Sequence, residues 1–592
     1  MLRPTRTKGL LLAAVVVAAA IPALAQDRTQ GPAPQSDTES ARTPSTSPAQ
    51  QPARRAQPRQ TQAAPAGEAE AEEVGGYTLP PPPVEIPEDA RRDPTIVGRL
   101  SPVQLGLGED PWGASSGALL SSLMRRLDTP IASRWAHMAL RNALLARVPA
   151  PGDVHPVDWA AERAWLLLRM GEADGSRMIV SAIDVRDFTP KMFQIAMQSA
   201  LANADPAALC PLQEGIRDLE RQVFPLVEAM CDALSGEPET AAAQIEAVRR
   251  RGRLSPIDVA LAEKVVGAAA NTGRAATIEW EPVDELNSWR FGLATATGMT
   301  FPERLMESAP PRILAWQAVA PIIAPETRLD SARAAAGLGV LSSQAMIDLH
   351  SLIYDRTGPD ELPETDAWQL RLAFVGEDLE TRLGAMRRLW EGAEGPLELQ
   401  AARAALGRAA ARVQPDADLQ AVAPNLIASM LAAGLDRQAA KWAGAVADMD
   451  DSYADRAWAL LALGAPAGAG VDVSLGRINA FIGRDDSPNK KRSALLVAGL
   501  AGLGKIDSNA ASSLNARHGL RLGRRSSWTQ AIDHAASLNQ PATVLLLIGT
   551  GLQTESFAGV PPSHQFHSIA ALKNSGQDFT ARMIAAEALA RT

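Results

Sequence analysis

Two cysteines, Cys210 and Cys231, are the only thiols among the 592 residues, and both lie in the stretch CPLQEGIRDLERQVFPLVEAMC. In an oxidising compartment two such thiols are more often joined than free. One straight helix between them would hold their α-carbons about 31 Å apart, whereas a disulfide needs them within about 7 Å. We therefore expect the chain to turn back near Gly215, so that a Cys210–Cys231 disulfide joins the two arms of a helical hairpin. Two unrelated buried thiols are the alternative.

The start of the chain indicates the compartment. Residues 1–25 carry three basic side chains, then an apolar run over residues 10–20, and end with small residues at Ala23 and Ala25. This pattern is typical of a secretory signal peptide cleaved before Gln26, and it predicts export to the periplasm or beyond. The apolar run is short for a bilayer, and no later stretch reaches about 18 uninterrupted apolar residues, so we expect no membrane span.

A serine and a glutamate are the side chains that could serve catalysis. Ser115 lies in GASSG, which fits the Gly-x-Ser-x-Gly turn that presents a nucleophilic serine in α/β hydrolases. Glu555 lies in TESF, which resembles the acid motif of lytic transglycosylases. No strand–helix alternation follows Ser115 to bring a histidine beside it, and only 36 residues follow Ser556, too few for a lysozyme-like domain. We expect Ser115 and Ser116 to cap a helix and Glu555 to lie in a solvated loop.

Two further motifs could bind a nucleotide or a metal. GLAGLGK, residues 499–505, fits the first seven positions of a P-loop, but Ile506 stands where the metal-binding Ser or Thr should be. His564 and His567 in HQFH are three positions apart, near enough on one helix to share a metal ion. We favour a loop between two helices for the first motif and surface histidines for the second, and we predict neither a cofactor nor a metal.

A recurring turn organises the elements around these residues. The segments GEADGSRMIV, GEPETAAAQI, GLDRQAAKWA and GQDFTARMIA each begin with a glycine and have a small residue five places later. The glycine ends one helix in the left-handed conformation, and the small residue lets the next helix approach the first. GEDLETRLGA at Gly376 is a weaker copy, with Thr381 at the small position. The four glycines are Gly171, Gly236, Gly434 and Gly576, followed by Ser176, Ala241, Ala439 and Ala581.

This turn resembles the join between the two helices of a tetratricopeptide repeat, whose unit is 34 residues long. The glycines, counting Gly376, stand 65, 140, 58 and 142 residues apart. The resemblance implies a stack of antiparallel helical hairpins in a right-handed α-solenoid, and it implies no ligand.

Composition predicts an all-α chain in three parts. Hydrophobic residues make up 46% of the chain and aromatic residues 4%, which favours closely packed alanine-rich helices. Residues 26–73 hold no apolar side chain larger than alanine or proline, so they cannot bury enough surface to offset the entropy of ordering. We expect a signal peptide over residues 1–25, a disordered tether over 26–95 with a polyproline II stretch from Tyr77, and a helical body over 96–592 whose first helix covers residues 117–127.

Charge narrows the class of partner. The chain carries a formal net charge of −9, and cleavage of the basic signal peptide leaves −12, with no dense basic stripe among aromatic residues. This pattern argues against nucleic acid. We expect a non-enzymatic scaffold or adaptor that binds another envelope protein or peptide along its curved surface. The alternative is an envelope hydrolase acting on esters or cell-wall polymer, with Ser115 or Glu555 as its catalytic residue.

Overall fold

The computed structural model describes residues 73–74, 77–78, 91–127, 130–271 and 277–592, with side chains from Arg91 onward. It divides into two compact units, Met1–Arg91 and Arg92–Thr592. In the first unit, β1 (Glu73–Val74) pairs antiparallel with β2 (Tyr77–Thr78), with Val74 opposite Tyr77. The predictions for residues 1–72 and 79–90, including the signal peptide and most of the tether, lie outside the described residues.

The β1–β2 pair corrects the prediction for Tyr77, which we expected to begin a polyproline II stretch. Gly75 and Gly76 stand between the two strands in the sequence. Two glycines between β-branched or aromatic residues are a hairpin signal, which the prediction passed over. Two strands thus lie inside the segment predicted to be a disordered tether.

The second unit is built mainly of α-helices, which confirms the predicted all-α class, and 66% of the described residues are helical. Its one strand pair among the described residues joins β3 (Ile96–Val97) to β4 (Val148–Pro149) in antiparallel register. Helix α1 (Gly117–Arg126) matches the predicted first helix. The next helices are α2 (Arg134–Leu145), α3 (Pro156–Arg169), α4 (Ala173–Val180), α5 (Pro190–Ala202), the 3-10 helix η3 (Pro206–Leu212), α6 (Gln213–Leu219), α7 (Phe224–Leu234), α8 (Pro238–Arg251), α9 (Pro256–Ala269), α10 (Ser288–Ala296), α11 (Glu303–Glu307), α12 (Pro311–Val319), α13 (Leu329–Leu338) and α14 (Ser343–Arg356).

Many of these helices begin at residues that cap the first turn or end at residues that stop a helix. The side chains of Ser116, Ser133 and Thr189 each accept a hydrogen bond from a backbone N–H three residues later, which caps α1, α2 and α5. Gly252, with φ +58°, ends α8 in the left-handed conformation. The remaining helices are α15 (Asp366–Val375), α16 (Leu379–Glu391), α17 (Pro396–Ala410), α18 (Ala423–Ala432), α19 (Asp436–Ala440), α20 (Ala443–Ala447), α21 (Asp451–Gly464), α22 (Leu475–Arg484), α23 (Lys491–Gly502), α24 (Ser508–His518), α25 (Ser527–Ser537), α26 (Pro541–Gly551), α27 (Pro562–Asn574) and α28 (Asp578–Ala590).

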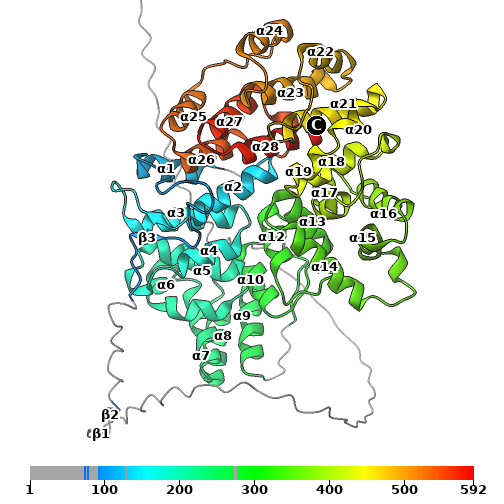
Figure 1. The fold of residues 1–592 in the computed structure, drawn as a ribbon. Helices are drawn as coiled ribbons and strands as arrows, with labels where there is room; N and C mark the ends of the chain where they lie inside the picture. The colour runs from blue at the N-terminus through cyan, green and yellow to red at the C-terminus, as the bar shows by residue number, and fades with distance from the viewer. Residues whose placement is uncertain (1–72, 75–76, 79–90, 128–129, 272–276) are drawn as a thin grey trace, which may run out of the picture. The chain divides into compact units, whose positions relative to one another are not determined.

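Helices from the two ends of the second unit pack against each other. Consecutive helices such as α3 and α4, α7 and α8, and α27 and α28 are in contact, but α2 also contacts α26 and α28 (Figure 1). Helix α28 touches α18, α21, α23 and α27 as well, and every residue from Ala581 to Leu589 is buried. The last helix therefore packs in the interior of the second unit.

Polar contacts fix the junction between α28 and α2. Glu587 Oε2 accepts a hydrogen bond from the Ser133 hydroxyl at 2.6 Å, and Glu587 Oε1 accepts one from the Arg134 backbone N–H at 2.9 Å. A carboxylate in this place satisfies backbone donors at the positive end of the α2 dipole. Arg591 Nη1 lies 2.9 Å from Glu587 Oε1 and donates to the Ala132 carbonyl at 2.5 Å, so the buried carboxylate has a cation beside it.

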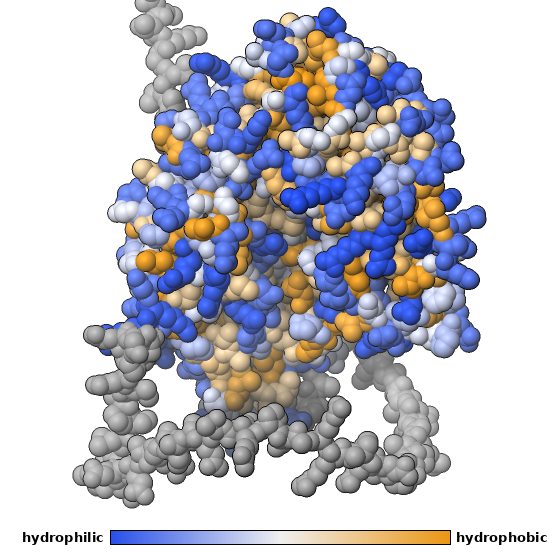
Figure 2. All heavy atoms as spheres, viewed as in Figure 1, coloured by the Kyte–Doolittle hydropathy of each residue, from blue (hydrophilic) through white to orange (hydrophobic). Residues whose placement is uncertain are grey.

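Charged and polar residues cover much of the outside. Figure 2 shows polar residues interleaved with small apolar patches over the face it presents. The exposed large apolar side chains are scattered along the described chain, from Ile96 in β3 to Phe579 in α28. Within the described ranges, no helix has the length and apolar character needed to span a membrane.

Candidate functional site

The two cysteines lie at disulfide distance. Cys210 belongs to η3 and Cys231 to α7, their α-carbons are 5.5 Å apart, and their sulfurs are bonded. Asp205 caps η3 by accepting a hydrogen bond from the Ala208 N–H at 3.2 Å. Cys231 is buried on α7 among Leu226, Val227 and Met230. The bonded pair therefore connects η3 to α7.

The prediction that the chain turns near Gly215 is wrong. Gly215 lies inside α6, and a Cβ at this position would lie 2.4 Å from the ring of Phe193 on α5. The glycine therefore allows α6 to approach α5 closely, and the chain turns later, between Leu219 and Phe224. Leu234, the last residue of α7, is 44% exposed.

The four predicted turn glycines occupy equivalent places. Gly171, Gly236, Gly434 and Gly576 each lie between two consecutive helices, with φ values of +87°, +92°, +77° and +80°. The small residues five places later, Ser176, Ala241, Ala439 and Ala581, are fully buried. Gly376 differs, because its φ is −53° and Thr381 is exposed, so the fifth segment is not a copy of this turn.

Turns with a positive φ but no glycine, and without a small residue five places later, were missed. Ala204 (φ +51°) lies between α5 and η3, and Asn539 (φ +53°) lies between α25 and α26. Five residues after each, Leu209 and Val544 are fully buried. Asparagine tolerates the left-handed region, which gave a usable signal at Asn539, whereas alanine gives none at Ala204.

The two serines of GASSG form hydrogen bonds that join neighbouring elements. The Ser115 hydroxyl donates to the Gln540 side-chain oxygen at 2.9 Å and lies 3.2 Å from the Thr543 hydroxyl. Ser116 caps α1 and donates to Asp153 at 2.6 Å. These contacts tie the start of α1 to α26 and to the segment before α3.

The segment that resembles a P-loop begins inside a helix, so the expected loop covers only its last three residues. Residues 499–502 form the end of α23. The Lys505 ammonium donates to the carbonyls of Ala462 and Ala465 at 2.7 and 2.9 Å, at the end of α21. Burial lowers the pKa of Lys505 to about 8. The lysine therefore satisfies backbone acceptors of a neighbouring helix.

The remaining candidates, Glu555, His564 and His567, do not form one site. Glu555 lies exposed in the loop between α26 and α27. His567 Nδ1 lies 2.8 Å from Asp533, whereas the His564 ring packs at a tilt against Trp528, with its Nδ1 3.2 Å from the Gly551 carbonyl. Nowhere in the described part of the chain do three His, Cys, Asp or Glu side chains gather in a way that could hold a metal ion.

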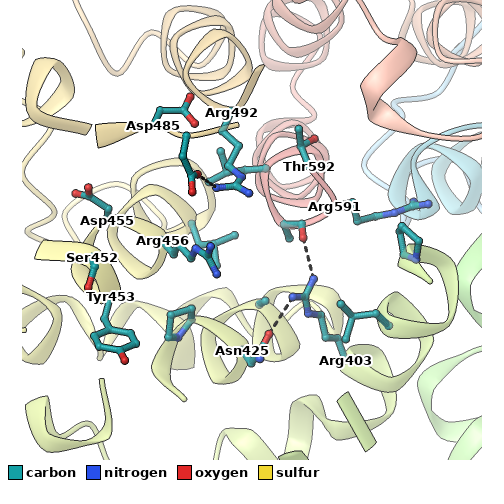
Figure 3. A pocket seen from close by; sticks show the side chains of 18 of the residues that line it. Arg403, Asn425, Ser452, Tyr453, Asp455, Arg456, Asp485, Arg492, Arg591 and Thr592 are labelled. Carbon is teal, nitrogen blue, oxygen red and sulfur yellow. Dashed lines mark hydrogen bonds and ion pairs between the residues drawn. The ribbon is translucent and has the colours of Figure 1, made fainter. Parts of the chain in front are cut away.

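A cavity of about 830 Å³ is the strongest candidate for a functional site. It lies where the first turns of α17, α18, α21 and α23 meet the end of α22 and the end of α28 (Figure 3). Its volume falls in the range of pockets that bind small molecules or short peptide segments. The polar lining residues include Arg403, Asn425, Ser452, Tyr453, Asp455, Arg456, Arg484, Asp485, Asp486, Arg492, Arg591 and Thr592.

Each of the three aspartates in the cavity wall already has partners. Asp455 accepts from Arg477 at 2.6 Å and from Arg484 at 2.7 Å. Burial acts to raise the pKa of Asp455, but these hydrogen bonds outweigh it and hold the pKa below its usual value. Asp486 lies 3.1 Å from Arg492.

Asp485 is held by hydroxyl and backbone donors. It accepts from the Ser493 hydroxyl at 2.5 Å and from the backbone N–H groups of Ser487 and Ser493 at 2.9 and 2.8 Å. Burial acts to raise the pKa of Asp485, but the hydrogen bonds together lower it. The carboxylate is therefore ionised and satisfied at neutral pH.

Arg403 is a buried cation at the floor of the cavity. Its side chain donates to the Ala590 carbonyl and to the Asn425 side-chain oxygen, both at 2.9 Å. Arg403 is 9% exposed, and its Nε is buried without a hydrogen-bond partner among the described residues. Burial lowers the pKa of Arg403 to about 10, and the positive charge of Arg591 acts in the same direction.

Arg456 is the exposed counterpart of Arg403. Figure 3 shows the two side chains entering the same space from α21 and α17. No ion pair joins Arg456 to any carboxylate in the described part of the chain. The cavity thus combines satisfied aspartates with two arginines that have no carboxylate partner.

Sequence reasoning missed this cavity. Its residues come from four separate stretches, 393–428, 452–460, 481–492 and 589–592, and none of these carries a local motif. The only available signal was the density of charge in DDSYADR and GRDDSPNKKR. Comparison of the chain with protein-family models, curated proteins and solved structures found no match.

Proposed function

We propose that this protein is an exported helical-repeat scaffold that binds another envelope protein or peptide, and that the cavity between α17, α18, α21 and α28 is where the partner docks. The observation that carries the proposal is the cavity itself, a space of about 830 Å³ enclosed by six helices and lined by both apolar and charged side chains. A bonded cysteine pair in a chain that begins with a secretory pattern supports export.

The spacing of the turns supports a repeat architecture. Positive-φ residues that follow helices occur at 171, 204, 236, 252 and 271, and again at 504, 519, 539 and 576. Without Gly252 and Gly519, which end α8 and α24, the intervals are 33, 32 and 35 residues and then 35 and 37 residues. These intervals are close to the 34-residue unit of tetratricopeptide repeats. We infer a solenoid of antiparallel helical hairpins whose two ends are joined through α2 and α28.

Two observations favour binding over the hydrolase alternative. The Ser115 hydroxyl donates to an amide oxygen, an arrangement suited to packing α1 on α26. Glu555 lies in an exposed loop between α26 and α27 and does not line the cavity. A fluorophosphonate probe tests the serine directly, because labelling that disappears in Ser115→Ala would establish a nucleophile.

Site-specific photocrosslinking tests the scaffold proposal. Tyr453 lines the cavity and is 40% exposed, so it can be replaced by benzoylphenylalanine without disturbing the core. Leu119, 58% exposed on α1 and outside the cavity, is the matched control. In cells that export the protein, irradiation should give a discrete crosslinked protein from position 453 and none from position 119. No adduct at 453, or the same adducts at both positions, would reject docking at the cavity.

A further inference from the structure

The geometry points to a ligand of one chemical class for the cavity: a peptide segment with acidic side chains and at least one apolar side chain among them. This inference rests on the proposed function and specifies what the scaffold recognises. It follows from the charges that are free in the cavity, from the helix ends that face it and from its apolar wall.

Among the side chains that line the cavity the unpaired charge is positive, while the terminal carboxylate of Thr592 adds one negative charge to the lining. Asp455, Asp485 and Asp486 are engaged by arginine, hydroxyl or backbone donors, as described above. A ligand cation would therefore have to displace an existing donor. Arg403 and Arg456 have no carboxylate partner among the described residues, so a ligand carboxylate gains charge-assisted hydrogen bonds without breaking an ion pair.

Arg403 gives the stronger argument, because it is a cation held out of water. Burying a charge without a counter-charge is costly, and its bonds to the Ala590 carbonyl and to Asn425 supply only neutral acceptors. A carboxylate in the cavity would provide the missing counter-charge. Arg456, which is exposed, can meet a second carboxylate nearer to solvent.

The N-terminal ends of four helices add to the positive potential in the cavity. Pro396, Pro424, Ser452 and Arg492 line the cavity from the first turns of α17, α18, α21 and α23. The N-terminal end of a helix carries a partial positive charge, which favours an anion nearby. Four such ends around one space reinforce the arginines.

The apolar wall decides between a peptide and a simple anion. Leu399, Leu460, Phe481 and Leu589 line the cavity beside the arginines. A phosphate or a small carboxylate would fill a minor part of about 830 Å³ and leave this wall against water. Arginine clusters commonly recognise acidic peptide motifs, and apolar side chains between the carboxylates would cover the wall.

A binding assay with defined peptides tests the inference on the full mature chain. The probe is a fluorescein-labelled peptide with blocked ends that alternates glutamate and leucine, and its matched control replaces each glutamate by glutamine. Fluorescence anisotropy at low salt should give at least about tenfold tighter binding of the glutamate peptide. Arg456→Gln should weaken it by about fivefold or more, whereas Arg251→Gln, an exposed arginine at the end of α8, should change it less than about twofold.

The outcomes separate this inference from the scaffold proposal. Equal binding of the two peptides, or no effect of Arg456→Gln in a variant that keeps the wild-type melting temperature, would overturn it. Citrate that displaces the peptide at equal concentration would overturn it too, in favour of a small carboxylate ligand. If position 453 crosslinks a partner while the glutamate peptide shows no preference, the scaffold stands and the acidic ligand fails. If the peptide binds as expected and position 453 captures no protein, the scaffold fails and the acidic ligand stands.

Discussion

Buried cations in this protein satisfy backbone carbonyls at the ends of helices. The Arg163 guanidinium donates to the Ala146 carbonyl at 2.7 Å and to the Leu144 carbonyl at the end of α2. Arg134 reaches the Ala336 and Ala432 carbonyls, at the ends of α13 and α18. The last carbonyls of a helix lack partners within it and carry partial negative charge. A buried cation there donates hydrogen bonds to these carbonyls and compensates their charge. Arg403 on α17 follows this pattern, since it donates to the Ala590 carbonyl at the end of α28.

His350 makes stability depend on pH. It is buried on α14 beside Asp366 and Arg333, and its Nδ1 has no hydrogen-bond partner among the described residues. Burial lowers the pKa of His350 to about 4, with Asp366 opposing the shift. The unfolded chain binds a proton near pH 6.5 and the folded protein only near pH 4, so stability present above pH 6.5 is lost as the pH falls between these values.

The variant His350→Leu should remove this dependence. Between pH 7 and pH 5 the free energy of unfolding should fall by about 2 kcal/mol more in the wild type than in the variant. Urea unfolding of both proteins at the two pH values measures the difference. Parallel losses would mean that His350 is protonated in the folded protein.

Substitutions at two turn glycines distinguish the cost of backbone strain from the cost of steric crowding. Both Gly171 (φ +87°) and Gly576 (φ +80°) adopt the left-handed conformation, which costs alanine about 1–2 kcal/mol. A Cβ at Gly171 would lie 2.6 Å from Ala315 Cβ, whereas nothing lies within 4 Å at Gly576. Gly171→Ala should therefore cost about 1–3 kcal/mol more than Gly576→Ala in chemical denaturation. Equal costs would show that the helices beside Gly171 can shift freely.

At the residue scale the sequence predicts positions that one amino-acid type must fill. A positive φ after a helix favours glycine, so Gly236 and Gly434 could be read as turn positions from their spacing. Arg403 and Arg456 could not be identified in this way, because arginine serves many surface roles and their significance arises only when six helices bring them to one cavity.

At the element scale, the cysteine pair links two short segments, η3 and α7. We expect non-reducing peptide mapping to join Cys210 to Cys231. Closing a loop of this length contributes about 3 kcal/mol in the chain-entropy model, so replacing both cysteines by serine should lower the melting temperature by about 2–10 °C. Hydrogen exchange should rise in η3, α6 and α7 and stay slow in α27 and α28, since neither contacts the disulfide-linked segments. Free thiols in the native protein would contradict the disulfide.

The boundaries of helices were more predictable from the sequence than the helices against which each one packs. The end of α8 at Gly252 and its start at Pro238 follow from glycine and proline punctuation. The prediction of a turn at Gly215 was wrong because a glycine inside a helix and a glycine at a turn look alike in the sequence. Only the position of Phe193 distinguishes them.

At the scale of the whole molecule, the buried α28 couples distant parts of the chain. Glu587 caps α2 across 454 positions of sequence, a contact that no local pattern announces. Glu587→Ala leaves Arg591 buried without its carboxylate and should cost about 3–5 kcal/mol. Hydrogen exchange should rise in α2 as well as in α28, whereas Glu555→Ala, in an exposed loop, should change neither. A rise confined to α27 and α28 would mean that the ends of the second unit fold independently.

The central claim is that the cavity, and not the N-terminal segment, recognises the partner. The direct measurement is the affinity of the purified mature protein for the protein crosslinked at position 453, compared with Arg456→Glu and with a deletion of residues 26–73. Arg456→Glu reverses a charge in the cavity and should weaken binding by about tenfold or more. The deletion removes a segment without large apolar side chains and should leave the affinity within about threefold. Unchanged affinity for Arg456→Glu together with loss of binding on deletion would contradict the account and assign recognition to residues 26–73.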